Sequence, residues 1–209
     1  MRARPFFIGI AGPSGSGKTT LARRLEELLP GSCALISLDS YYHELAHLSL
    51  DQRGRCNFDH PDALDWNLLL SQLAALSAGQ PIEQPLYNFE THTRAKETVP
   101  VSPAGFVIVE GILTLYRDDV RRALDLKVYV DAPDANCFDR RLERDMRERG
   151  RTRESVHYQY QKTVRPMAEL YVWPTRVWAD LILSGTGSLE EACGAVLALI
   201  PQNHRTVTG

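Results

Sequence analysis

The sequence predicts an α/β fold in which a five-stranded parallel sheet is flanked by helices. A glycine-rich loop lies between the first apolar run, Phe6–Ala11, and an amphipathic segment from Thr20 to Leu29. Further short apolar runs alternate with segments of helical periodicity, which is typical of strands that run parallel in one sheet. Ligands of such sheets bind beyond the carboxyl ends of the strands, so we expect a functional site at that edge.

The composition of the 209-residue chain disfavours several classes of function. Its net charge of −2 argues against a general nucleic-acid or membrane surface, and no segment approaches the length of a membrane span. We therefore expect a single domain over residues 1–209 that acts in the cytoplasm without nucleic acid or a membrane. Four widely spaced cysteines without a CxxC pair agree with reduced thiols: Cys33, Cys56, Cys137 and Cys193.

The glycine-rich loop has the spacing G-x-x-x-x-G-K-T of a phosphate-binding loop, or P-loop. Glycines let several backbone N–H groups turn toward one anion, and the following helix adds its positive N-terminal end. Lys18 is predicted to reach the β- and γ-phosphates, and the Thr19 hydroxyl to ligate Mg²⁺. A plain turn is the alternative, and the complete motif between a strand and a helix disfavours it. The expected contacts are Gly12, Ser14, Gly15, Ser16, Gly17, Lys18, Thr19 and Thr20.

Two further predicted strands end in acidic residues at the same edge. The run Cys33–Leu38 is followed by Asp39, which we interpret as a base for an attacking hydroxyl, rather than as a helix N-cap or turn residue. The run Phe106–Val109 ends at Glu110, which is expected to hold Mg²⁺ together with Thr19. The fourth and fifth strands are predicted at residues 125–131 and 179–183.

Several helices are predicted between and after these strands. A packing helix is expected from Asp62, its N-cap, to Ser77. A later helix, residues 155–171, is expected to kink or break at Pro166, which lacks a backbone N–H. The polar tail, residues 201–209, is expected to fray.

In residues 80–104 the alternation of strand and helix patterns stops, and the composition predicts a hairpin-like lobe outside the main sheet. Four prolines punctuate two short extended segments, 84–89 and 97–101, which are joined by residues 90–96. Tyr87, Phe89 and His92 give this lobe an aromatic, hydrogen-bonding surface that suits a planar base. Taken alone, His92 is better explained as a surface histidine.

An arginine-rich stretch, residues 140–153, is predicted to form a lid. Arg140, Arg144 and Arg147 share one face of a helix over residues 133–148, and a glycine follows its end. Interspersed glutamates leave a solvated helix face as the alternative. Beside a P-loop we favour a lid whose arginines neutralise charge on a transferring phosphoryl group.

These motifs together resemble the uridine kinase (uridine–cytidine kinase) family from Phe6 to about Leu183. The most specific strings are Asn57-Phe-Asp-His-Pro61 and Glu148-Arg-Gly-Arg151. Other matching strings are Ser37–Tyr42, Pro85–Phe89, Thr91–Arg94, Val109–Leu113 and Gln159–Pro166.

The resemblance implies a P-loop kinase that transfers the γ-phosphoryl group of ATP, or GTP, to the 5′-hydroxyl of uridine or cytidine with Mg²⁺. It implies Asp39, Lys18 and Arg144 as catalytic residues, and a homotetramer. Implied triphosphate contacts are Arg144, Arg149 and Arg151. Implied nucleoside contacts are Asp59, Arg141 and Gln159 for the ribose, and Tyr42, Tyr87, Phe89 and His92 for the base.

Two positions depart from the family pattern. Ser184-Gly-Thr-Gly187 stands where the family usually carries Pro-Arg-Gly, near the expected donor base, so the preference between ATP and GTP stays open. Asn88 stands where an aspartate is commonest. The remaining alternatives are another small-molecule kinase, such as a phosphoribulokinase-like or pantothenate kinase-like enzyme, and a nucleotide-binding switch without catalysis.

Overall fold

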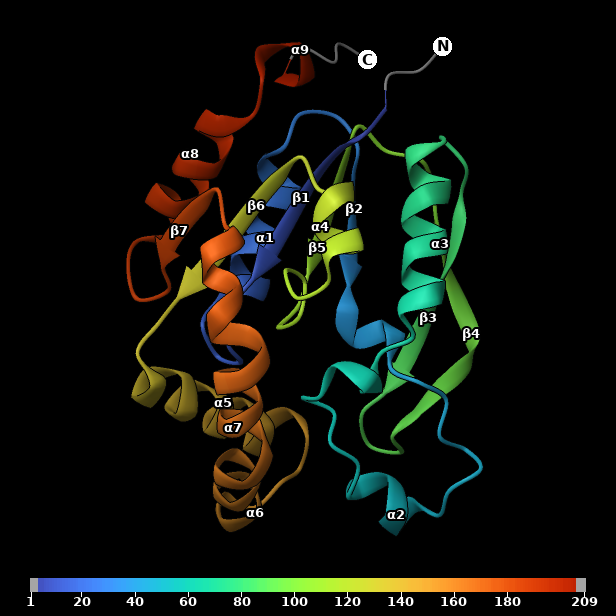
Figure 1. Ribbon diagram of the computed structural model, residues 1–209, viewed down its shortest axis with the longest axis vertical. Coiled ribbons are helices and arrows are strands. Elements are labelled where there is room, and N and C mark those ends of the chain that lie inside the picture. Colours follow the sequence, from blue (N-terminus) through green and yellow to red (C-terminus); the bar gives the residue numbers. More distant parts are fainter. Residues whose placement is uncertain (1–3, 206–209) are drawn as a thin grey trace.

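The computed structural model describes residues 4–205 and contains the expected five-stranded parallel sheet (Figure 1). The strand order is β2-β5-β1-β6-β7, so β1 lies at the centre. The strands are β1 (Phe6–Ala11), β2 (Cys33–Ser37), β5 (Phe106–Glu110), β6 (Leu126–Asp131) and β7 (Leu181–Ser184). Strand β1 pairs with β5 on one side and with β6 on the other, and β2 lies beyond β5. The chain therefore continues in opposite directions from the β1–β5 pair, which makes the gap between these two strands the topological switch point.

The register of the strands brings their carboxyl ends together. Glu110 at the end of β5 pairs with Ser37 of β2 on one side and with Ile10 of β1 on the other. The P-loop follows β1 directly, and Asp39 follows β2 in a 3₁₀ turn, Leu38–Tyr41. The expected meeting of these groups at one edge is therefore a consequence of parallel pairing.

Two apolar clusters cover the two faces of the sheet. Alternate side chains of β1 point to opposite faces, so Phe7 joins one cluster while Ile8 and Ile10 join the other. Helices α1 (Lys18–Leu28) and α8 (Leu189–Leu199) pack on the face of Ile8. Helices α3 (Trp66–Ser77) and α4 (Asp118–Ala123) pack on the face of Phe7.

The predicted lobe is a separate antiparallel hairpin of β3 (Ile82–Asn88) and β4 (Thr93–Val101). Its strands are longer than expected, and only residues 89–92 connect them. A two-stranded sheet has no central strand, which is why its prolines are tolerated within the pairing. Arg94 ties the hairpin to the main body, with 3.2 Å contacts to the Asp65 carboxylate and a 3.0 Å hydrogen bond to the Tyr41 carbonyl.

The predicted start of the packing helix was wrong by three residues. Asp65, not Asp62, is the N-cap of α3, and its carboxylate accepts a hydrogen bond from the Leu68 N–H at 3.1 Å. Pro61–Ala63 instead forms a 3₁₀ turn, after which Leu64 is extended and bridges to Tyr42. This bridge holds the chain away from helical dihedrals until Asp65. A short helix, α2 (Leu50–Gly54), precedes this region.

The helical region after β6 runs on past the expected break. Helix α5 (Asp134–Glu148) is followed by α6 (Arg153–Gln159) and α7 (Arg165–Met167). Wider π-helical turns, residues 160–164 and 168–172, flank Pro166, and the backbone stays helical through it. The missing N–H of a proline is tolerated where the turns are already irregular. A 3₁₀ segment, residues 173–178, then leads to β7.

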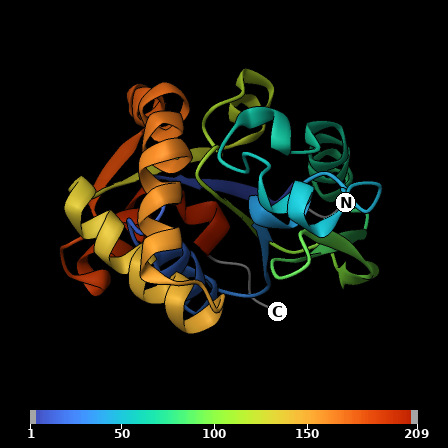
Figure 2. The same ribbon diagram turned by 90° about the horizontal axis from the view of Figure 1, so that it is seen from below.

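In the tail, Gln202–Arg205 forms a helical turn, α9, while residues 206–209 lie outside the described part. Within residues 4–205, none of the helices combines the length and apolarity that crossing a membrane requires. Figure 2 looks onto the carboxyl edge of the sheet, with α5, α6 and α7 on one side and the β3–β4 hairpin on the other.

Candidate active site

The P-loop has a backbone shape that only glycine adopts easily. Gly15 and Gly17 have φ values of 84° and 100°, and α1 begins immediately afterwards at Lys18. A Cβ atom on Gly15 would lie 2.3 Å from the backbone oxygen of Cys137, and one on Gly12 would lie 2.3 Å from that of Val130. The loop is therefore fixed by steric exclusion, and it leads directly into a helix N-terminus, an arrangement whose backbone N–H groups typically bind an anion.

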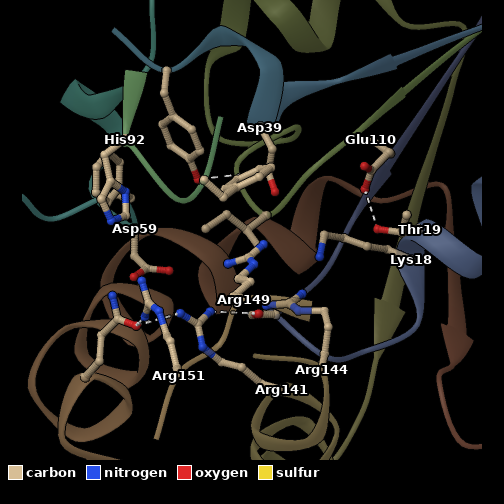
Figure 3. A pocket seen from close by; sticks show the side chains of 16 residues that line it. Lys18, Thr19, Asp39, Asp59, His92, Glu110, Arg141, Arg144, Arg149 and Arg151 are labelled. Carbon is tan, nitrogen blue, oxygen red and sulfur yellow. Dashed lines mark hydrogen bonds between the residues drawn. The ribbon is translucent and has the colours of Figure 1, made fainter. Parts of the chain in front are cut away.

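Acidic and hydroxyl groups meet beside the P-loop. The Thr19 hydroxyl donates to Glu110 Oε2 at 3.1 Å (Figure 3). The Ser37 hydroxyl donates to Oε1 of the same carboxylate at 2.8 Å. Both carboxylate oxygens of Glu110 are thus oriented. Burial lowers the pKa of Lys18, although Glu110 and Asp39 oppose that shift.

Thr19 and Glu110 fit a magnesium site in their chemistry. Both offer oxygen ligands, which Mg²⁺ prefers, and they lie within hydrogen-bond distance of each other. Mg²⁺ usually takes one or two protein oxygens and completes its shell with water and substrate phosphates. A closed protein cage is not needed, and residues 4–205 contain no cluster of three or more acidic, histidine or cysteine ligands.

Asp39 lines the same cavity as Lys18. Among the described residues, its carboxylate accepts one side-chain hydrogen bond, from the Tyr42 hydroxyl at 3.4 Å. It therefore caps no helix, in contrast to Asp65. An aspartate with unused acceptor capacity at this position can take a proton from a bound hydroxyl.

Aromatic side chains form the far end of the cavity. The His92 ring stacks on Phe58 with centroids 5.0 Å apart and 14° between planes, and Tyr42 meets Phe58 edge-on at 5.3 Å. His92 has φ 53°, a strained conformation for a non-glycine residue. Its pKa is lowered by burial and by three nearby arginines, so the ring is neutral near pH 7. Tyr87 packs behind Tyr42 and Phe58.

Polar groups close the cavity toward α5 and α6. Arg141 donates to the Ser14 hydroxyl at 2.9 Å and to Gln159 Oε1 at 3.2 Å, and Arg151 donates to the same Gln159 oxygen. The Arg149 guanidinium lies 4.5 Å from the centroid of the Phe89 ring, which joins the arginine stretch to the tip of the hairpin. Burial raises the pKa of Asp59, while Arg141 partly offsets this effect.

The structure brings most of the predicted site residues to this one cavity. Those that line it are Ser14, Lys18, Thr19, Asp39, Tyr42, Asp59, Phe89, His92, Glu110, Arg141, Arg144, Arg149, Arg151 and Gln159. Of the others, Tyr87 lies behind the aromatic wall, and Gly12, Gly15, Ser16, Gly17 and Thr20 lie within or just after the P-loop without lining it.

Sequence reasoning missed two residues that line the cavity, Phe58 and Ile112. Phe58 belongs to the specific Asn57–Pro61 string, so its position beside Asp59 was an available signal. Ile112 follows Gly111 after β5, in a segment where no side chain had been assigned a role.

A second hollow lies on the other side of the P-loop, against the loop that departs from the family pattern. Arg140 donates to the Gly185 carbonyl at 2.8 Å and to the Gly15 carbonyl at 3.3 Å, joining the two loops. A Cβ on Gly185 would lie 2.0 Å from the Ser16 backbone oxygen. The hollow is lined by backbone, hydroxyl and apolar groups, including Gly17, Thr20, Arg140, Ser184, Gly185, Gly187 and Ser188.

A P-loop at the switch point of a parallel sheet, with oriented acidic groups and an arginine cluster around one cavity, defines a P-loop phosphotransferase. Residues 7–189 match the model of the phosphoribulokinase/uridine kinase family, and the chain belongs to that family. It is accordingly an enzyme that transfers phosphoryl groups.

Relatives named uridine kinase match nearly the whole chain. A Lactobacillus helveticus protein of that name is 46% identical over 191 residues, which cover 90% of each chain. A Clostridium perfringens protein is 44% identical over 200 residues, covering 95% of this chain and 96% of its own. A Yersinia pestis protein is also 44% identical, with coverages of 93% and 94%.

Solved structures of related folds agree with the architecture. Phosphoribulokinase from Rhodobacter spheroides superposes with a TM-score of 0.65 at 14% identity, covering 87% of this chain and 70% of its own. A D-glycerate 3-kinase from Cryptococcus neoformans gives 0.61 at 22% identity, with coverages of 80% and 79%. At these identities the likeness concerns the fold alone.

Proposed function

We propose that this enzyme is a pyrimidine ribonucleoside kinase that transfers the γ-phosphoryl group of ATP or GTP to the 5′-hydroxyl of uridine and cytidine, giving UMP and CMP. One observation carries the proposal: a single cavity has the P-loop lysine at one end, an aromatic wall with His92 at the other, and Asp39 near its middle. The relatives named uridine kinase support the same substrate class.

On the donor side, the P-loop and Lys18 would bind the triphosphate, and Thr19 and Glu110 would hold Mg²⁺. Bound there, the ion supplies charge neutralisation on the phosphate oxygens. Arg144, Arg149 and Arg151 would meet the charge that moves to the bridging oxygen as the phosphoryl group transfers. The second hollow, against residues 184–188, is a suitable position for the donor base, and its lining of backbone and hydroxyl groups is compatible with either purine.

On the acceptor side, Asp39 would accept the proton of the 5′-hydroxyl as that oxygen attacks the phosphorus. The ribose hydroxyls would be held by polar groups that converge near Phe58: Asp59, Arg141 and Gln159. Tyr42, Phe89 and His92 would contact the base, with Tyr87 as support. A neutral imidazole presents a donor or an acceptor according to its tautomer, so it can serve the 4-oxo group of uridine and the 4-amino group of cytidine.

We further propose that residues 1–209 act as one kinase domain in which residues 140–153 close as a lid. Closure over the cavity would exclude water, which otherwise competes as acceptor. The left-handed Gly150, with φ 60°, sits where such a segment would pivot. The 4.5 Å contact between Arg149 and Phe89 gives the lid a docking point on the hairpin.

We also propose that the enzyme forms a homotetramer and acts in the cytoplasm. The outer side of the hairpin exposes apolar side chains, Leu86 and Val99, which suits a contact between subunits. The four free cysteines suit a reducing compartment. Size-exclusion chromatography with light scattering would test the assembly.

Two rival functions remain to be tested against this one. A phosphoribulokinase-like enzyme would act on a sugar phosphate, for which the stacked aromatic wall has no evident use. A non-catalytic switch would have no use for an Asp39 with unused acceptor capacity. A phosphorylation assay over nucleosides and sugar phosphates separates the three. We expect turnover with uridine and cytidine only. Phosphorylation of a sugar phosphate, or a lack of turnover with every acceptor tested, would overturn the proposal.

A further inference from the structure

A buried carboxylate lies behind the arginines of the cavity. Asp145, on α5, is fully buried and does not itself line the cavity. Its Oδ1 atom accepts hydrogen bonds from Arg144 Nε at 2.9 Å and Nη2 at 2.7 Å, and it lies 3.7 Å from Arg149 Nε. Its Oδ2 atom lies 3.5 Å from Arg141 Nε. One carboxylate thus serves three arginines that all line the cavity.

These contacts differ from a structural ion pair in which every buried polar atom has a hydrogen-bond partner. Asp145 Oδ2 and Arg141 Nε are both buried, and neither has a hydrogen-bond partner within residues 4–205. Burial alone raises the pKa of Asp145, but Arg141, Arg144 and Arg149 outweigh it, so the pKa lies below its ordinary value and the group is ionised. A buried ion pair gains little for stability unless its remaining atoms are also satisfied.

The contact with Arg144 fixes which edge of that side chain faces the cavity. Asp145 engages Nε and Nη2, which leaves Nη1 outside the contact, and Figure 3 shows Arg144 lying close to Lys18. Arginine donors have a rigid planar fork, so holding one edge orients the other. Without a counter-charge, the arginines and Lys18 would repel one another in a partly buried space.

We propose that Asp145 is a positioning residue for phosphoryl transfer. Its carboxylate holds one edge of the Arg144 guanidinium so that the other edge faces the cavity, and its negative charge compensates the positive charge of the three arginines before the triphosphate binds. This inference rests on the proposed kinase function. Asp145 acts only through the arginines, because it does not touch the cavity.

The first test compares Asp145→Asn with Glu143→Gln. Each removes one negative charge from α5, but Glu143 is 77% exposed and, within residues 4–205, forms an ion pair with Arg147 alone, so its variant is a matched control. We expect kcat for uridine to fall at least tenfold in Asp145→Asn and to stay near wild type in Glu143→Gln. Equal kcat values in the two variants would overturn the proposal.

A second readout separates positioning from general damage to the fold. The Asp145→Asn cavity carries one more net positive charge, so inorganic tripolyphosphate should bind at least as tightly as to wild type while kcat falls. Parallel loss of tripolyphosphate affinity and kcat would assign Asp145 a purely structural role. If Asp145→Asn does not fold, Asp145→Glu keeps the charge and displaces the carboxylate, and the same split between affinity and kcat is expected.

A double-variant cycle identifies the arginine through which Asp145 acts. In an Arg144→Gln background, Asp145→Asn should lower kcat by less than twofold further, because its target is already absent. Full multiplication of the two effects would contradict action through Arg144. If the wild type fails to phosphorylate pyrimidine nucleosides, the proposed function fails, and kcat is then compared with the acceptor that the wild type does phosphorylate, so the split between tripolyphosphate affinity and kcat still tests Asp145.

Discussion

The two walls of the cavity are held in different ways. The sheet-edge wall comprises Ser14, Lys18, Thr19, Asp39 and Glu110, which follow strands β1, β2 and β5. The outer wall comprises Phe89, His92, Arg144, Arg149 and Arg151, which lie on the hairpin and on the arginine stretch. Strand register and glycine sterics fix the first wall, whereas side-chain stacking and one buried carboxylate hold the second.

This difference assigns separate tasks to the two walls. Under the proposed function, the P-loop, the Mg²⁺ ligands and the catalytic base lie on backbone that cannot shift without breaking the sheet, which favours precise in-line placement. The groups proposed to select the nucleobase and to close over the phosphates would lie on side-chain contacts that can be remade, as a moving lid requires. Substitutions on the sheet-edge wall should therefore cost far more than those on the outer wall.

The largest expected effect is that of Asp39→Asn on the sheet-edge wall. Without the carboxylate, the 5′-hydroxyl loses its base, and kcat should fall by about 10²–10⁴-fold. Uridine binding, measured by calorimetry, should change little because the aromatic wall is intact. Asp62→Asn is the control, since the Asp62 side chain is 91% exposed. Near-normal turnover in Asp39→Asn would remove this residue from the mechanism.

The next effect is that of Gly15→Ala in the P-loop. The added Cβ would meet the Cys137 backbone oxygen at 2.3 Å in a conformation that L-residues avoid, so the N–H groups must shift. Losing an aligned donor of this kind costs about 10²–10³-fold, here in kcat/KM for the donor. Gly54→Ala is the matched control, because nothing lies within 4 Å of its Cβ position. Equal kinetics in both variants would mean that the loop is not rigid.

The sequence was sufficient to predict the sheet-edge wall because its determinants are local. The motif Gly12–Thr19 follows one strand, Asp39 lies just after a second and Glu110 ends a third, so parallel pairing alone brings these residues to one edge. The start of α3 was mispredicted because a tertiary bridge between Tyr42 and Leu64 decides it.

The outer wall was predictable as a set of residues but not as an arrangement. The stacking of His92 on Phe58 and the burial of Asp145 depend on how the hairpin and α5 fold against the sheet, and no local pattern encodes this. Asp145 was assigned no role from the sequence, where it lies in a run of mixed charges. Its contacts with three arginines depend on the folded arrangement.

A smaller effect is expected where the two parts of the outer wall meet. Phe89→Leu removes the aromatic face under Arg149, a contact worth about 0.5–1 kcal/mol, or roughly two- to fivefold. We expect this factor in KM for uridine, whose base Phe89 would contact, and in KM for the donor, whose phosphates Arg149 would contact. Phe89→Tyr keeps the ring and should behave as wild type. A change of equal size in both variants would show that the aromatic face is not the cause.

The smallest effect concerns pH and the choice of nucleoside. Burial, together with Arg151, Arg149 and Arg53, lowers the pKa of His92 below its ordinary value of 6.5. Above that lowered pKa the neutral ring can donate to uridine or accept from cytidine, whereas the protonated ring can only donate. As pH falls from about 8 to about 5, kcat/KM for cytidine should therefore decline before that for uridine.

The nontitrating variant His92→Gln sharpens this last test. A glutamine amide offers both a donor and an acceptor at every pH, so the ratio of cytidine to uridine kcat/KM should become independent of pH. The comparison uses a ratio, which cancels effects on Asp39 and the phosphates, because both nucleosides share them. A ratio that stays constant in the wild type, or that still varies in His92→Gln, would mean that another group on the outer wall selects the base.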